Sequence, residues 1–473
     1  MKNKILMFST SVLVISLIVN SLIYYCNSLG FGERKCAQYK PSRIDITFSH
    51  RNQCLQSVKA SQNETTNEWN MNTLEEIETR GYKVSTHTIL SKDGYYSTLY
   101  RISGGKRSPS NPGKRSILVF HGFAAAAQSW IIQPGSRNLA FTLADASYDV
   151  WLANIRGTTA SKNHTHLNAD TDSAYWDFGI EQVSTLDLPL MVSLILQETG
   201  TDKIYYVCHS AGCEIQLAGL VDVPELNDKI EASFYLAPGG FVGSGYNPIF
   251  NLLRLIGTPL QQLLLKISGG KMSGEPSALL KFLGLSADNI CKWSFTRCGI
   301  CDNFLFALYG ADPEQMDYNN FPNIIKKLQD NGPWRIFFHG VQMVKACEFL
   351  RYDFGERRNL LEYGSANPPV YNLSSMTVPT YIFYGEGDNF LTPWDMARMK
   401  AAIPKQFVKG FYQVDWPKFN HIDFLIAKDA MFWYITRFGI LWMKLNRNGS
   451  YKIFSGLTGI PFLKVSVIVY DLV

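Results

Sequence analysis

The chain has 473 residues, of which 46% are hydrophobic and 18% are charged, a composition typical of a globular protein rather than a disordered one. Its formal net charge of +5 is too small to indicate a nucleic-acid-binding protein, and no basic run or nucleic-acid motif stands out. The length fits one large domain with insertions or two ordinary domains.

The N-terminus carries the pattern of a secretory signal. Lys2 and Lys4 precede an apolar run that extends from Ile5 to about Tyr25, and a basic segment followed by an apolar one directs a chain into the secretory pathway. We predict a signal peptide or signal anchor over residues 1–28, and we favour cleavage over a retained membrane anchor. Residues 29–71 are polar and irregular, which indicates a linker. The expected destination is the extracellular space or the lysosomal lumen.

Four N-x-S/T sequons and nine cysteines agree with this route. The sequons make glycosylation candidates of Asn63, Asn163, Asn372 and Asn448. The candidate disulfide pairs are Cys36 with Cys54, and Cys291 with Cys298 or Cys301. Cys208 and Cys213 are interpreted as small buried residues. The C-x-x-C pair, Cys298 and Cys301, has no second pair of zinc ligands in a suitable spacing, so we expect no structural metal. No motif indicates a cofactor.

Structured segments begin near residue 72. A short helical run over 74–77 precedes two alternating strands, 82–90 and 95–102, around a Lys92-Asp93-Gly94 turn. Further apolar runs predict strands at 117–120, 150–153, 204–207, 232–236, 380–384 and 407–414. Helical patterns lie between them, for example at 183–199, and this alternation predicts a mostly parallel sheet flanked by helices. Such sheets bind ligands at the carboxyl ends of their strands.

Residues 240–365 interrupt the alternation. They contain no clear strand, and their helical runs lie at 250–265, 278–283 and 321–328. We predict that this segment is a helical cap inserted over the sheet. The α/β core is then divided into 72–239 and 366–443, and residues 444–473 form a tail of unknown role.

One serine follows a predicted strand within a cluster of small residues. The sequence Cys208-His209-Ser210-Ala211-Gly212 lies between the strand at 204–207 and a helical run at 214–220. A strand, a tight turn with a serine and a helix form the nucleophile elbow of an α/β-hydrolase, although the usual first glycine is Cys208. On its own, this motif fits a buried structural serine better than a nucleophile. The catalytic interpretation therefore depends on whether the chain also supplies a base and a carboxylate.

A serine nucleophile needs a base and a carboxylate that orients the base. His421 follows the last predicted strand, where a catalytic histidine has to lie, and the alternative is a histidine packed in an aromatic core. Asp388 follows the strand at 380–384 and gives the chain order serine, aspartate, histidine that α/β-hydrolases use. Glu386 lies too early in its turn, Asp395 is expected to start a helix, and Asp415 is the best alternative.

The negative charge that develops during attack needs two backbone N–H donors. Ala211, directly after the serine, is predicted to supply one. The loop after the strand at 117–120 contains His121-Gly122-Phe123, and Phe123 is predicted to supply the other. The alternative for His121-Gly122 is an ordinary turn.

From about Leu74 to Met443 the chain resembles the acid lipases, the group that includes gastric lipase and lysosomal acid lipase. The resemblance is carried by Gly81-Tyr82, Asp93-Gly94-Tyr95, Leu99-Tyr100-Arg101, His121-Gly122, Asp149-Val150-Trp151-Leu152-Ala153-Asn154, Arg156-Gly157, Trp176-Asp177-Phe178, Tyr352-Asp353, Pro368-Pro369-Val370-Tyr371-Asn372-Leu373 and Asn420-His421-Ile422-Asp423-Phe424. So many motifs in the same order are specific to this family.

The resemblance implies a hydrolase of neutral lipid esters, such as triacylglycerols or cholesteryl esters, that works at a lipid–water interface. It places the triad on Ser210, Asp388 and His421. It also implies that the cap is a lid with an internal disulfide, which Cys291 and Cys301 fit best.

This sequence departs from the family at Cys208, Ala211 and Phe123, where the relatives have glycine, glutamine and leucine. These departures motivate an alternative function, a lipid-binding protein of the same fold with impaired catalysis. The sequence does not indicate an oligomeric state.

Overall fold

The computed structural model describes residues 71–106, 113–135, 137–245, 247–255, 257–272 and 301–430. Several predicted features lie outside these residues. They are the signal segment, nearly all of the linker, the helical run at 278–283, the C-terminal tail, Asn63, Asn448, Cys36, Cys54, Cys291 and Cys298. Within the described part of the chain, no helix is long and apolar enough to cross a membrane.

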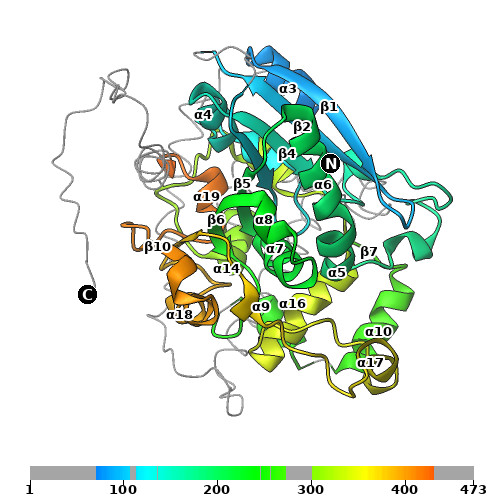
Figure 1. Cartoon of the computed structure of the whole chain (residues 1–473). Coiled ribbons are helices and arrows are strands. Elements are labelled where there is room, and N and C mark those ends of the chain that lie inside the picture. The colour runs from blue at the N-terminus through cyan, green and yellow to red at the C-terminus, as the bar shows by residue number, and fades with distance from the viewer. Residues whose placement is uncertain are drawn as a thin grey trace, which may run out of the picture.

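The described residues form an eight-stranded sheet (Figure 1) in the order β1-β2-β4-β3-β5-β6-β9-β10. Its strands are β1 (Lys83–Leu90), β2 (Tyr96–Gly104), β3 (Ser116–Phe120), β4 (Asp149–Asn154), β5 (Ile204–Ser210), β6 (Ile230–Pro238), β9 (Thr380–Tyr384) and β10 (Val408–Gln413). Every strand predicted from the sequence is present, with ends that differ by at most a few residues.

The sheet is parallel except at one edge. β1 and β2 form an antiparallel hairpin, and β2 also runs antiparallel to β4. All the other neighbouring pairs are parallel. All side chains of β3, β4 and β9 are buried, as expected for parallel strands covered on both faces. This arrangement is the predicted α/β-hydrolase fold.

Helices pack on the strands they connect. α6 packs on β3 and β5, α7 on β5 and β6, and α4 on β2 and β4. The helices of the core are α3 (Thr73–Thr79), α4 (Leu139–Asp145), α5 (Ile180–Gln182), α6 (Leu188–Thr199), α7 (Ala211–Asp222), α8 (Leu226–Lys229), α18 (Pro393–Ala402) and α19 (Asp423–Ile426). The short turns of 3-10 helix are η3 (Ala127–Ile131), η4 (Thr159–Ser161), η5 (Ser173–Trp176), η8 (Leu373–Ser375) and η9 (Lys405–Phe407).

The helix predicted at 183–199 is not uniform. Its first turn is a π-helix, η6 (Val183–Asp187), and α6 follows and ends at Gly200. Gly200 adopts a φ of 67°, the left-handed conformation that commonly ends a helix. The π turn has no signature in the apolar pattern, which is why the sequence predicted one continuous helix.

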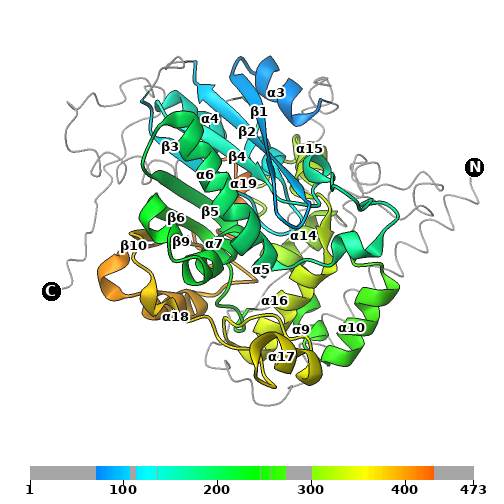
Figure 2. The same cartoon turned by 45° about the vertical axis from the view of Figure 1, so that its right-hand side comes forward.

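The described part of the segment between β6 and β9 consists of helices, connecting loops and one short strand pair. Its elements are α9 (Pro248–Leu253), α10 (Thr258–Ile267), β7 (Lys271–Met272), α14 (Asp302–Tyr309), α15 (Phe321–Leu328), β8 (Gly332–Pro333), α16 (Trp334–Ala346) and α17 (Glu356–Tyr363). Figure 2 shows α9, α10, α16 and α17 grouped together below the sheet. α16 packs against both α9 and α10.

Two predictions for this segment were wrong. The helical run at 250–265 is interrupted, because α9 ends at Leu253 and α10 starts at Thr258 with a proline in its first turn. Pro259 lacks the N–H that a continuous helix needs, but it is tolerated at a helix start. The segment also contains a strand pair, since β7 and β8 form a short antiparallel ladder.

Candidate active site

Ser210 lies at the junction of β5 and α7. β5 ends at Ser210 and α7 starts at Ala211, so no loop separates the strand from the helix. The backbone of Ser210 has φ 54° and ψ −124°, outside the regions that non-glycine residues normally adopt. Such strain persists only where the surrounding structure imposes it, and it is the backbone form of a nucleophile elbow.

Close backbone contacts hold the elbow. A Cβ atom added to Gly212 would lie 2.5 Å from the carbonyl oxygen of His121 and 2.8 Å from that of Phe120, so only glycine fits there. On the other side, Gly239 donates its N–H to the carbonyl of Ser210 at 3.0 Å. The start of α7 is therefore pressed against the end of β3, and Ser210 is tied to the end of β6.

Cys208 and Cys213 are joined by a disulfide bond across the elbow. Both are fully buried, but the prediction that they are merely small buried residues was wrong. The turn from strand to helix folds the chain back and brings their Cα atoms to 5.1 Å, within the range that a disulfide requires. The cysteine that replaces the usual elbow glycine is thus one half of a covalent link around Ser210.

The structure brings the three predicted triad side chains into one hydrogen-bonded line. The Nε2 atom of His421 lies 2.9 Å from Oγ of Ser210, and its Nδ1 atom lies 2.8 Å from Oδ2 of Asp388. The other oxygen of Asp388 accepts the backbone N–H groups of Phe390 and Leu391 at 2.7 and 2.9 Å. Asp388 is therefore buried, fixed and oriented towards the imidazole.

The competing acids lie elsewhere. Glu386 and Asp415 are exposed, and Glu386 accepts a hydrogen bond from Gln413. Asp395 is buried at the third position of α18, where it forms a capping box with Thr392. The prediction that Asp395 starts a helix is confirmed.

The loop predicted to complete the oxyanion site lies against the nucleophile. A Cβ atom on Gly122 would lie 3.1 Å from Cβ of Ser210, and Phe123 and Ala211 line the same cavity as Ser210. His121 fixes this loop, because its Nε2 accepts the N–H of Ile155 at 3.3 Å and its Nδ1 donates to the carbonyl of Gly122 at 2.8 Å. Burial lowers the pKa of His121 to about 4, which keeps this neutral tautomer in place.

The role of His209 was not predicted from the sequence. Its Nε2 donates to the backbone carbonyl of His421 at 2.8 Å, and the two rings lie 4.9 Å apart. Burial, and then the neighbouring His421, lowers the pKa of His209 to about 3, so the ring stays neutral. On another side of His421, the ring of Tyr309 is nearly parallel to the imidazole at 6.0 Å. The hydrogen bond from His209 and the contact with Tyr309 both restrict the imidazole of His421. Neither contact could be recognised from a pattern of neighbouring residues in the sequence.

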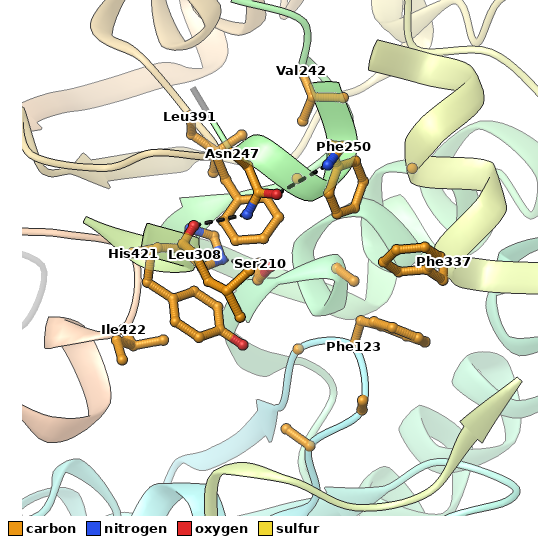
Figure 3. A pocket seen from close by; sticks show the side chains of 18 of the residues that line it. Phe123, Ser210, Val242, Asn247, Phe250, Leu308, Phe337, Leu391, His421 and Ile422 are labelled. Atoms are coloured by element: carbon orange, nitrogen blue, oxygen red, sulfur yellow. Dashed lines mark hydrogen bonds between the residues drawn. The ribbon is translucent and has the colours of Figure 1, made fainter. Parts of the chain in front are cut away.

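A cavity of about 350 Å³ opens above Ser210. Figure 3 shows Ser210 in the middle of the lining residues with His421 beside it, Phe123 and Phe337 on one side and Leu391 on the other. Phe250 and Val242 from the inserted segment form part of its wall, and the side chain of Asn247 bonds the carbonyl of Leu308 and the N–H of Phe250. The cavity is therefore mainly apolar, with polar groups that are mostly paired, as in sites that bind apolar ligands.

One acidic group in this cavity was not singled out from the sequence. Glu214 lies in the first turns of α7, lines the cavity and is 5% exposed. Burial, and then the charge of Glu181, raises the pKa of Glu214 to about 8. The carboxyl group is therefore neutral in acidic and neutral solution.

The remaining predicted site residues that the structure describes lie outside the cavity. Asn163 and Asn372 are exposed, as glycosylation requires. Cys301 is buried and disulfide-bonded, and so is Cys347, for which the sequence predicted no partner. Within the described residues, no group of three or more histidine, cysteine, aspartate or glutamate side chains is arranged to hold a metal ion.

Comparisons with known proteins agree with this geometry. Residues 73–134 match a family described as a partial alpha/beta-hydrolase lipase region, and residues 115–226 match the alpha/beta hydrolase fold. The chain is 33% identical to gastric triacylglycerol lipase of Mus musculus over 366 residues, which cover 77% of this chain and 89% of that protein. It is 32% identical to lipase member K of Homo sapiens over 365 residues, which cover 77% of this chain and 88% of that protein.

The disulfide around Ser210 should contribute measurably to stability. Replacing both Cys208 and Cys213 by alanine should lower the free energy of unfolding by about 2 kcal/mol, the loop-closure contribution of a short disulfide loop. Ester hydrolysis should fall by less than about ten-fold, because the sheet ladder and Gly212 still shape the elbow. Denaturant unfolding under non-reducing conditions measures the first effect. Equal unfolding midpoints for the double variant and the wild type would contradict it.

Glu214 should make stability depend on pH. Its pKa is raised from 4.5 to about 8 in the folded protein, so the unfolded state loses this proton first and stability falls as the pH rises from about 4.5 to 8. Glu214→Gln should therefore raise the melting temperature at pH 7.5 by about 2 °C or more, and not at pH 4.5. Glu225→Gln, an exposed acid after α7, is the control. A melting-temperature gain that is the same at both pH values would refute this account.

Proposed function

Because the chain belongs to the acid lipase family, which includes gastric triacylglycerol lipase, we propose that it hydrolyses neutral lipid esters, such as triacylglycerols or cholesteryl esters, with Ser210, His421 and Asp388 as its catalytic triad. The observation that carries the proposal is the continuous line of hydrogen bonds from Oγ of Ser210 through the imidazole of His421 to Asp388, at 2.9 and 2.8 Å.

In this mechanism His421 acts as the base. Its Nε2 takes the proton of Ser210 while Asp388 accepts the hydrogen bond from Nδ1 and stabilises the imidazolium. Oγ of Ser210 attacks the ester carbonyl, and the N–H groups of Phe123 and Ala211 donate to the oxyanion. Each such donor is worth about 3 kcal/mol of transition-state stabilisation. His421 then protonates the leaving alcohol, and water releases the fatty acid from the acyl-enzyme.

The cavity supports an uncharged, apolar substrate. Phenylalanine and leucine side chains such as Phe123, Phe337 and Leu391 form much of the wall (Figure 3), and none of the described residues that line the cavity is a lysine or an arginine. A negatively charged headgroup would lose its hydration there without a partner of opposite charge. A neutral ester with an aliphatic chain meets no such cost.

α10 supports contact with a lipid surface. Leu260, Leu263 and Ile267 are 47%, 49% and 74% exposed on this helix, and Leu255 just before it is 55% exposed. In Figures 1 and 2, α10 lies at the edge of the molecule beside α17. A helix that presents leucine and isoleucine to solvent gains free energy when these side chains enter a lipid surface, by about 25 cal/mol per Å² of apolar area.

The disulfides support a place in the secretory pathway, either outside the cell or in the lysosomal lumen. Cys208 and Cys213 are bonded to each other, and Cys301 and Cys347 are also disulfide-bonded. Such bonds form and persist in oxidising compartments. The exposed sequon residues Asn163 and Asn372 are accessible for glycosylation along the same route.

Substitution of the triad tests the mechanism. Ser210→Ala, His421→Ala and Asp388→Asn should each lower kcat/KM for a short-chain fluorogenic ester by at least about 10⁴-fold, because the three groups act as one unit. Asp415→Asn, at the best alternative carboxylate, should stay within two-fold of the wild type. Assays should cover acidic to neutral pH. A folded wild-type protein that neither hydrolyses the ester nor reacts with a serine-directed phosphonate would instead support a lipid-binding protein without catalysis.

The exposed apolar side chains of α10 should affect hydrolysis only at a lipid–water interface. Leu263→Ser with Ile267→Ser should lower hydrolysis of an emulsified triacylglycerol by about ten-fold and leave hydrolysis of a dissolved short-chain ester within two-fold, because only the emulsion requires apolar adsorption. Leu90→Ser is the control, since Leu90 on β1 is 48% exposed. An equal loss on both substrates would show that these residues support folding rather than adsorption.

A further inference from the structure

Glu214 occupies a position next to the reacting centre that the proposed mechanism does not use. Glu214 lies in the first turn of α7, four residues after Ser210, and a Cβ atom added to Gly239 would lie 2.9 Å from Oε2 of Glu214 and 3.3 Å from the carbonyl oxygen of Ser210. Glu214, Ser210 and Gly239 line one wall of the cavity.

The neighbouring backbone makes room for this carboxyl group. A Cβ atom added to Gly239 would lie 2.9 Å from Oε2 of Glu214, so any larger residue would displace the glutamate. The Oε1 atom is buried and has no hydrogen-bond partner among the described residues. Burying a carboxyl oxygen without a partner is costly, and a bound ligand would offset that cost.

Several other polar side chains of the cavity have hydrogen-bond partners within the protein. Asp330 accepts hydrogen bonds from Thr159 and Gln128. His209 donates to the backbone of His421, and Asn247 bonds Leu308 and Phe250. Among the described carboxyl groups that line the cavity, Glu214 is therefore the one placed to bond a substrate.

The proposed chemistry indicates which part of an ester faces Glu214. In the tetrahedral intermediate the oxyanion points to Phe123 and Ala211, and the leaving oxygen points to His421, which protonates it. We take the acyl chain to follow the remaining direction, along the cavity wall that Glu214 and Gly239 line. Because one point at Gly239 lies 2.9 Å from Oε2 of Glu214 and 3.3 Å from the carbonyl oxygen of Ser210, the carboxyl group is then within reach of the first few carbon atoms of the acyl chain.

We propose that Glu214 is a specificity-determining residue that hydrogen-bonds a hydroxyl group on the acyl chain, a few carbon atoms from the scissile carbonyl. Esters of hydroxylated fatty acids are then the preferred substrates within the class, and this inference rests on the proposed ester hydrolysis. The raised pKa of Glu214 supports it, because a neutral carboxyl group both donates and accepts hydrogen bonds with a hydroxyl group.

The test compares acyl chains on one leaving group. The substrates are 4-methylumbelliferyl octanoate, 3-hydroxyoctanoate and 6-hydroxyoctanoate, since hydroxyl groups at carbons 4 and 5 would close to lactones. For the full-length secreted protein, kcat/KM for at least one hydroxylated ester should exceed that for octanoate by about ten-fold or more. In Glu214→Met, which keeps the volume but loses the hydrogen bond, the ratio should fall to about one.

Two further variants make the test specific. Glu214→Gln keeps a hydrogen-bonding group and should retain most of the preference. Gln216→Met changes a buried side chain of α7 that does not line the cavity, and its ratio should equal that of the wild type. The wild-type ratio tests the proposal even if Glu214→Met does not fold.

The outcomes separate the two proposals. Wild-type ratios within three-fold of one, with Ser210-dependent hydrolysis of all three esters, would overturn the role of Glu214 and leave the proposed function intact. A preference that survives in folded Glu214→Met would also overturn it. Failure to hydrolyse any of the esters would remove the proposed function and this inference together.

Discussion

The backbone of Ser210 is the constraint on which the site depends. A φ of 54° is unfavourable for serine, and three contacts impose it. β5 is paired with β3 and β6 up to its last residues, Gly212 lies against the carbonyls at the end of β3, and Gly239 bonds the carbonyl of Ser210. The position of Oγ is therefore set by the central sheet rather than by a flexible loop. The imidazole, the two donor amides and the cavity wall are all placed relative to this one atom.

The strands and the order of the site residues could be predicted because their signals are local. Runs such as 117–120 and 380–384 are apolar throughout, since parallel strands are covered on both faces. Residues that end parallel strands meet at one edge of the sheet, so Ser210, Asp388 and His421 could be brought together without knowing the path of the intervening chain. The elbow also keeps its second glycine at 212, where no side chain fits.

The features that the sequence did not reveal depend on distances between segments. The link between Cys208 and Cys213 requires the backbone reversal at the elbow, and no spacing rule distinguishes it from two buried thiols. The contact of His209 with the carbonyl of His421 joins residues 212 positions apart. The importance of Glu214 emerges only beside Gly239, on a different strand end. The break between α9 and α10 was visible as Gly257 and Pro259, but the surrounding apolar pattern concealed it.

The hydrogen bond from His209 to His421 has a mechanical consequence. Two consecutive residues hold the same histidine at different points, His209 at the backbone carbonyl and Ser210 at the ring. The spacing between Oγ of Ser210 and the imidazole of His421 is thus controlled by two adjacent residues of β5, His209 and Ser210. The inserted segment holds the same loop from the other side, because the N–H of His421 donates to the carbonyl of Tyr309 at the end of α14. A rearrangement of α14 around a large substrate would therefore be transmitted to the base, while His209 keeps that base tied to the central sheet.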